Sequence, residues 1–224
     1  GDPSIVLFDR AVKAGWLDLP QGARVLELGC CETDFYQWLL KADPTIELTG
    51  VDVNECSYGG VEFWKAPAET LRFKPGSFDA VLCLGSLEHF GLGYYGDPVN
   101  DTAQQEVAAL ISDWLVPGGV WYYDVPWTPA ASYVTDNRHF RVYDDVELDM
   151  LDALSGGTEI GRAYAHGDGE QGGGQQPLTA HLFGAGRLRL SWFLWHSLRA
   201  LIRGASPRRS LELKATSVSC LSVG

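Results

Sequence analysis

The 224-residue sequence predicts an α/β protein with a doubly wound, mostly parallel, seven-stranded sheet that ends on a closing antiparallel strand. Short runs of β-branched and aromatic residues alternate along the chain with stretches of helical periodicity, which is the order of parallel crossover units. The last run, residues 211–223, alternates apolar and polar residues. We therefore expect residues 211–223 to close the sheet as an antiparallel strand.

Strand and helix signals follow one another through the first half of the chain. The run at residues 78–84 is the strongest buried-strand signal, because it is almost wholly apolar and follows a Pro-Gly turn. Residues 33–41 have helical periodicity and end before Asp43-Pro44, which stops a helix. The strands expected here are residues 24–28, 46–51, 61–65 and 78–84.

The second half continues the same alternation up to residue 165. A helix is expected over residues 100–115, because apolar residues recur there at helical spacing until Pro117 and two glycines end the pattern. A second helix is expected over residues 144–154, before a Ser-Gly-Gly stop. Strands are expected at residues 120–125 and 158–165.

The chain is expected to form a single domain over residues 1–224, because its length suits one hydrophobic core. Within it, residues 167–210 are expected to be an insertion made of a glycine-rich hinge and a basic amphipathic helix. Seven basic residues and one acid lie between residues 181 and 224. We interpret the insertion as a lid over the site, with a partner contact or an arm on a membrane surface as alternatives.

Composition and charge limit the partners of the protein. Its net charge of -12 argues against general nucleic-acid binding, because phosphates would be repelled. No apolar stretch approaches the roughly 20 residues needed to cross a bilayer. The five cysteines form no CxxC pair and are expected to be free thiols in a reducing compartment, which favours a cytoplasmic protein. The oligomeric state stays open.

A glycine follows the strand expected at residues 24–28, and Asp52 ends the next strand. A glycine turn lets the backbone approach a ligand, while a carboxylate at a strand end can accept hydrogen bonds from both hydroxyls of a ribose. The dinucleotide-binding glycine pattern is missing, since Cys31 and Asp34 stand at its later glycine positions. These strand ends therefore favour a ligand with a ribose, but not a dinucleotide.

Four segments stand in the order and spacing of class I S-adenosylmethionine (SAM) methyltransferases: LELGCCETD, TGVDVN, APAETLRFKPGSFDAVLCLGSLEHF and WLVPGGVWYYDVP. This resemblance covers about residues 24–150, and it implies a Rossmann-like methyltransferase fold with SAM as the cofactor. It implies that the glycine loop holds the methionine part, an acid holds the ribose, and the segment after Pro67 contacts the adenine. The cofactor residues so implied are Glu27, Leu28, Gly29, Cys30, Cys31, Asp52, Val53, Ala68, Glu69, Leu84 and Gly85. Two departures are that Cys31 and Thr33 replace glycines of the family, and that Pro67 replaces an acid.

A second block, GSLEHFGLGYYGDP followed by NRHFRVYDDVEL, resembles poorly characterised methyltransferase-like proteins. Its glycines would allow a tight excursion of the chain over the strand ends. We expect that excursion and the later segment to face a substrate, although an aromatic loop folded on itself is the alternative. The substrate-binding residues expected are Tyr94, Tyr95, Asp97, Arg141 and Tyr143.

Three titratable residues are candidates for catalysis. His139 and His89 follow neighbouring strands, and a neutral imidazole can accept the proton that an oxygen or nitrogen loses on methylation. His139 is the preferred proton acceptor and His89 its substitute; each could instead order a turn. Glu88 is a third candidate, although capping or holding the following loop is its more ordinary role.

The adjacent pair Cys30-Cys31 gives no metal site, because no further ligand stands at a suitable spacing, so no metal is expected. The sequence favours a SAM-dependent methyltransferase for a small molecule, acting on a hydroxyl of a sugar or natural product. A non-catalytic relative that serves as a binding or assembly module is the alternative, which Cys31, Thr33 and Pro67 favour. A peripheral membrane protein that acts through the basic helix is the third.

Overall fold

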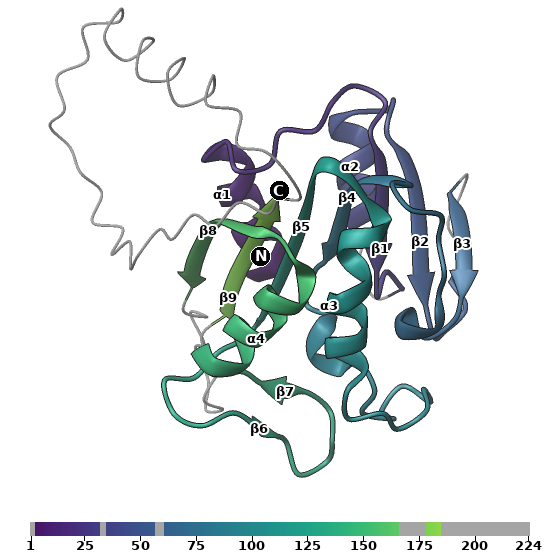
Figure 1. The fold of residues 1–224 in the computed structure, drawn as a ribbon. Coiled ribbons are helices and arrows are strands. Elements are labelled where there is room, and N and C mark those ends of the chain that lie inside the picture. Colours follow the sequence, from purple (N-terminus) through teal and green to yellow (C-terminus); the bar gives the residue numbers. More distant parts are fainter. Residues whose placement is uncertain (1–2, 32–34, 57–60, 166–177, 185–224) are drawn as a thin grey trace, which may run out of the picture.

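The computed structural model describes residues 3–31, 35–56, 61–165 and 178–184, which form one seven-stranded sheet with helices on both faces. The strand order is β3-β2-β1-β4-β5-β9-β8. Figure 1 shows this sheet from strand β8 to strand β3. The strands are β1 (Arg24–Leu28), β2 (Glu47–Asp52), β3 (Glu62–Lys65), β4 (Phe78–Cys83), β5 (Leu115–Pro126), β8 (Thr158–Ala165) and β9 (Leu178–Gly184).

The first five strands pair in parallel, and β9 runs antiparallel between β5 and β8. The doubly wound α/β class with an antiparallel strand is therefore confirmed. The short strands β6 (Tyr133–Val134) and β7 (Arg141–Val142) form a separate hairpin. Because the parallel strands all end at one edge, the loops that follow them meet there, which is where this class of sheet binds ligands.

Helices cover the two faces of the sheet in pairs, and the central strands β1, β2 and β4 are accordingly buried along almost their whole length. Figure 1 shows α3 and α4 on the face nearer the viewer, and α1 and α2 lie behind. Leu26 of β1 packs in the core cluster that includes residues of α3 and α4, while the next residue back, Val25, packs with residues of α1 and α2. The helices are α1 (Pro3–Lys13), α2 (Phe35–Ala42), α3 (Ala103–Trp114) and α4 (Asp145–Ser155), with short turns η1 (Ala68–Thr70) and η2 (Leu87–His89).

The antiparallel strand beside β5 is not where the sequence analysis placed it. Residues 178–184 pair with β5 over seven positions, so this part of the expected 167–210 insertion is a strand of the sheet. The assignment of residues 178–184 to the insertion was wrong. A strand this short, directly after a glycine-rich stretch, shows too little alternation of apolar and polar residues to be recognised. Residues 211–223 and the basic helix expected between residues 188 and 202 lie outside the described residues.

The described helices are short compared with a membrane span. None of them, within those residues, combines the length and apolarity that crossing a bilayer requires. Helix α1, at residues 3–13, was not among the expected elements, and its buried residues Leu7, Phe8 and Ala11 complete the core on its face of the sheet.

Candidate functional site

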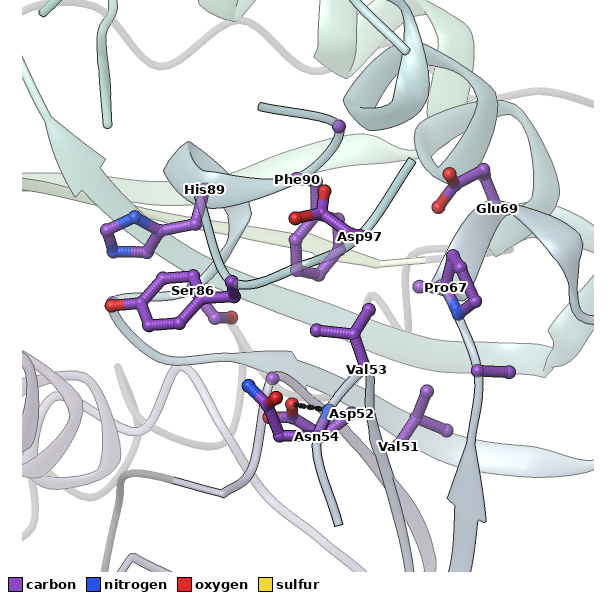
Figure 2. A pocket seen from close by; sticks show the side chains of 16 residues that line it. Val51, Asp52, Val53, Asn54, Pro67, Glu69, Ser86, His89, Phe90 and Asp97 are labelled. Carbon is purple, nitrogen blue, oxygen red and sulfur yellow. Dashed lines mark hydrogen bonds between the residues drawn. The ribbon is translucent and has the colours of Figure 1, made fainter. Parts of the chain in front are cut away.

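A pocket lies at the carboxyl ends of β1, β2 and β4. Figure 2 shows its walls, which are built by the loops after these strands and by η1 and η2. Six of the expected cofactor residues line it: Gly29, Asp52, Val53, Ala68, Glu69 and Gly85. The expected cofactor residues that are not in its wall are Glu27, Leu28, Cys30, Cys31 and Leu84.

Gly29 forms the turn that joins β1 to the pocket. Its backbone has φ +75°, and an added Cβ would lie 2.3 Å from the Cβ of Ser86, so both conformation and space require glycine. The Ser86 hydroxyl donates to the carbonyl of Leu28 at 2.7 Å, and the Gly29 N–H donates to the carbonyl of Val51 at 2.8 Å. These bonds hold three loops together and leave the backbone of Gly29 facing the pocket.

Asp52 ends β2 with its carboxylate held in place. One oxygen accepts from the N–H of Cys31 at 3.0 Å and the other from the N–H of Asn54 at 2.8 Å. Asp52, Val53 and Asn54 lie together along one side of the pocket in Figure 2. A half-buried carboxylate with a fixed orientation can accept hydrogen bonds from a pair of hydroxyl groups.

The far end of the pocket is formed by η1. Ala68 and Glu69 are buried there behind Pro67, and Figure 2 shows Glu69 and Pro67 at the opposite end from His89. Burial is the main cause that raises the pKa of the Glu69 carboxyl, and the charges of Glu106 and Asp97 add to it. A carboxyl group that keeps its proton more readily can donate as well as accept a hydrogen bond.

The glycine-rich block forms an excursion over the pocket, but only part of it reaches the wall. Tyr95 and Asp97 line the pocket. Tyr94 is about half exposed and its ring packs 4.2 Å from that of His139. Arg141 pairs with Glu147 across 3.7 Å, outside the wall.

We expected Tyr143 to contact a substrate, but its side chain does not line the pocket. It is buried in the core, and its hydroxyl donates to the carbonyl of Leu87 at 3.4 Å. Burial raises the pKa of this phenol well above its ordinary value. The spacing of the block along the chain could not show that Tyr143 turns inward, because that depends on how β7 crosses behind η2.

The two candidate histidines form a pair in which one supports the other. His89 lines the pocket, and its Nδ1 lies 2.5 Å from the backbone carbonyl of His139. A carbonyl only accepts, so Nδ1 of His89 is the donor in this contact, and in the neutral form of the ring Nε2 is then the acceptor. The side chain of His139 is not in the wall and lies 3.4 Å from the hydroxyl of Tyr95. Of the two histidines, His89 is thus the one whose side chain lines the pocket, and the catalytic role of either stays a prediction.

Glu88 lies under the pocket rather than in its wall. It is buried close to Asp124, and burial first and the charge of Asp124 second raise its pKa well above the ordinary value. Asp124 also accepts a hydrogen bond from the N–H of Gly85 at 3.3 Å. Glu88 is therefore a buried side chain that does not line the pocket, and its catalytic role stays a prediction.

The cysteines are not all free. Cys31 and Cys56 form a disulfide, with their Cα atoms 5.3 Å apart. Cys30 and Cys83 are buried and, within the described residues, belong to no disulfide, and Cys220 is outside the described residues. The expectation of five free thiols is thus wrong for this pair, because Cys56 is distant in sequence and joins Cys31 only when β1 and β2 lie side by side.

Residues 26–122 match the family model described as "Methyltransferase domain". No curated protein matches the sequence closely enough to be compared. Among solved structures, the fold is similar to a 1,6-didemethyltoxoflavin-N1-methyltransferase from Burkholderia thailandensis, with a TM-score of 0.60 and 19% identity over 82% of this chain and 76% of that one. It is also similar to the [4+2]-cyclase SpnF, with a TM-score of 0.60 and 16% identity over 80% of each chain.

A third similar structure is the N-methyltransferase NodS from Bradyrhizobium japonicum in complex with S-adenosyl-L-homocysteine, with a TM-score of 0.53 and 16% identity over 83% of this chain and 89% of that one. At these identities the structures share the fold. The family match covers β1 to β5 and the loops that build the pocket. Residues 26–122 of this chain therefore match a methyltransferase-domain family, and the chain shares its fold with solved methyltransferases.

Proposed function

We propose that this protein transfers the methyl group of SAM to a hydroxyl group of a small molecule, a sugar or another natural product. The observation that carries the proposal is the position of the Asp52 carboxylate in the wall of a pocket whose backbone turn requires Gly29. The Asp52 carboxylate can accept hydrogen bonds from the ribose hydroxyls of SAM, and the turn at Gly29 lets the backbone approach the cofactor closely.

The residues present fit SAM despite the missing glycines. Cys31, which replaces a glycine of the family, is not in the pocket wall, and its sulfur is bonded to Cys56. The Cys31 side chain therefore does not occupy the part of the pocket that SAM would need. Asp52 would hold the ribose, Ala68 and Glu69 the adenine, and the backbone of Gly29 and Gly85 the methionine end.

The acceptor would bind beside Tyr95 and Asp97, which lie in the same wall as His89. Hydroxyl-bearing molecules can exchange hydrogen bonds with the phenol and the carboxylate there. His89 would take the proton of the acceptor hydroxyl on Nε2, because Nδ1 is held by the carbonyl of His139. SAM, when bound, supplies the methyl group, and the pocket holds the acceptor in line with it.

A second candidate function is binding or other chemistry without methyl transfer. The solved cyclase with the same fold favours it, since fold alone does not determine activity. The two candidates differ in one measurement: a methyltransferase turns SAM into S-adenosylhomocysteine in the presence of its acceptor, and a binding module does not.

The first test is calorimetry with SAM and S-adenosylhomocysteine. Replacing Asp52 by Asn should weaken binding by about 1 to 3 kcal/mol, because one charge-assisted hydrogen-bond acceptor is lost. Glu47→Gln is the matched control, since Glu47 is exposed at the other end of the same strand and should leave binding unchanged. Absence of a binding signal in the unmodified protein at millimolar SAM would disprove the cofactor assignment.

A further inference from the structure

Three sulfur atoms and a carboxylate converge beside the pocket. The side-chain ligand atoms of Cys30, Cys31, Cys56 and Asp52 all lie within 4.8 Å of one another. We propose that this set, the thiol cluster, binds one zinc ion when the Cys31–Cys56 disulfide is reduced.

The donor types suit zinc. Thiolates are the preferred ligands of structural Zn²⁺, with sulfur about 2.3 Å from the metal, and a carboxylate can complete the tetrahedron. Four ligand atoms within 4.8 Å of one another are close to the mutual separations that such a tetrahedron requires. Small side-chain rotations would then close the site.

The backbone fixes the cluster from two strands. The N–H groups of Gly29 and Cys30 both donate to the carbonyl of Val51, at 2.8 and 3.4 Å. The carboxylate of Asp52 is oriented by the N–H groups of Cys31 and Asn54. Hydrogen bonds that orient a ligating carboxylate are typical of built metal sites, because they hold it in place before the ion arrives.

The disulfide and the metal exclude each other, since a bonded sulfur pair offers no thiolate. A phosphine reductant cleaves the S–S bond: phosphorus is oxidised and leaves as the phosphine oxide with oxygen from water, and the water protons complete the two thiols. Zinc binding then releases the thiol protons to solvent. The redox state of Cys31 and Cys56 would therefore decide whether the site exists.

Asp52 belongs to both the thiol cluster and the pocket wall. If the proposed function also holds, zinc and SAM compete for this carboxylate. The zinc inference does not depend on SAM binding, because its test measures only the metal and the thiols.

Cobalt(II) titration of the phosphine-reduced full chain is the first test. We expect one ion per chain, with thiolate charge-transfer bands and the visible bands of tetrahedral cobalt, both lost on adding zinc. Cys30→Ser and Cys56→Ser should weaken these bands strongly. Cys83→Ser is the control, since Cys83 is a buried thiol of β4 outside the cluster. Reduced protein without thiolate bands, or bands unchanged in Cys56→Ser, would overturn the proposal.

A second measurement uses only the unmodified chain, in case the variants do not fold. The reduced protein is alkylated with and without zinc, and the labelled peptides are quantified by mass spectrometry. Zinc should slow labelling of Cys31 and Cys56 by tenfold or more, on the order expected for bound thiolates. Equal labelling rates with and without zinc would refute the site.

Discussion

At the scale of single residues, the pair His89 and His139 illustrates how a backbone group can determine the role of a side chain. The carbonyl of His139, not its imidazole, fixes the protonated nitrogen of His89. A substitution at residue 139 keeps that carbonyl, whereas a substitution at residue 89 removes the ring from the pocket. The two histidines are therefore expected to behave differently although they lie side by side, with ring centres 5.1 Å apart.

His89→Ala should lower the rate of methyl transfer by about 100-fold or more, because general bases contribute on the order of 10²–10⁴. His139→Ala is the matched control and should lose much less. Both rates would be measured at saturating SAM with a hydroxylated acceptor found by screening, and SAM affinity should stay the same. An equal loss in the two variants would show that the ring of His139 also takes part.

Glu88 makes stability depend on pH. Its pKa is raised by burial and by Asp124, so the folded protein holds the proton more tightly than the unfolded chain. The resulting stabilisation is present at low pH and is lost as the pH rises from the unfolded pKa of about 4.3 towards the folded pKa. The glutamine of Glu88→Gln stays neutral at every pH. The free energy of unfolding of this variant should therefore rise, relative to that of the unmodified protein, as the pH increases over this range. Urea unfolding at a series of pH values measures the gain; parallel curves would contradict the assignment.

At the scale of elements, the excursion after η2 is shaped by glycines with left-handed backbone. Gly91 has φ +72°, its carbonyl accepts from the N–H of Asn100 at 2.8 Å, and an added Cβ would lie 1.9 Å from the carbonyl oxygen of Asn100. Gly96 has φ +87° and no atom within 4 Å of an added Cβ. Backbone conformation and lack of space both disfavour a side chain at position 91, whereas only backbone conformation disfavours one at position 96.

Gly96→Ala should cost about 1 to 2 kcal/mol of stability, the penalty of a left-handed conformation for a residue with a Cβ. Gly91→Ala should cost more and should also weaken SAM binding, because Gly91 lines the pocket and must move. Urea unfolding and calorimetry would measure the two effects. If both alanine variants are equally stable, the close approach of Asn100 to Gly91 does not limit the side chain at position 91.

At the scale of the whole molecule, β9 attaches the edge strand β8 to the rest of the sheet. It pairs with β5 on one side and with β8 on the other, so β8 is attached to the sheet only through β9 among the described strands. Deleting residues 167–210, the segment expected to be an inserted lid, would remove this strand. We therefore expect that deletion to disrupt the fold rather than only turnover.

Two truncated chains test this arrangement. A chain of residues 1–184 keeps every described strand and should melt within about 4 °C of the full chain, the shift that 1 kcal/mol causes in a domain of this size. A chain of residues 1–165 lacks β9, exposes the edge of β5 and should aggregate or lose its cooperative transition. Thermal unfolding followed by circular dichroism distinguishes them, and similar transitions in both would show that β9 is dispensable.

The sequence by itself determined the features that depend on neighbouring residues. Strands at residues 24–28 and 78–84 follow from local apolar runs, and the turn at Gly29 and the acid at Asp52 follow from their place at strand ends. Because parallel strands bring their ends to one edge, these local signals were enough to indicate the pocket.

Only the tertiary structure decided the features that depend on residues far apart in the chain. The Cys31–Cys56 disulfide, the support of His89 by His139 and the inward turn of Tyr143 each need two elements to pack together first. The place of β9 is decided in the same way, by the edge that β5 offers to an antiparallel partner. Local periodicity reports which face of an element is buried, whereas which element buries it is set by the packing of the whole chain.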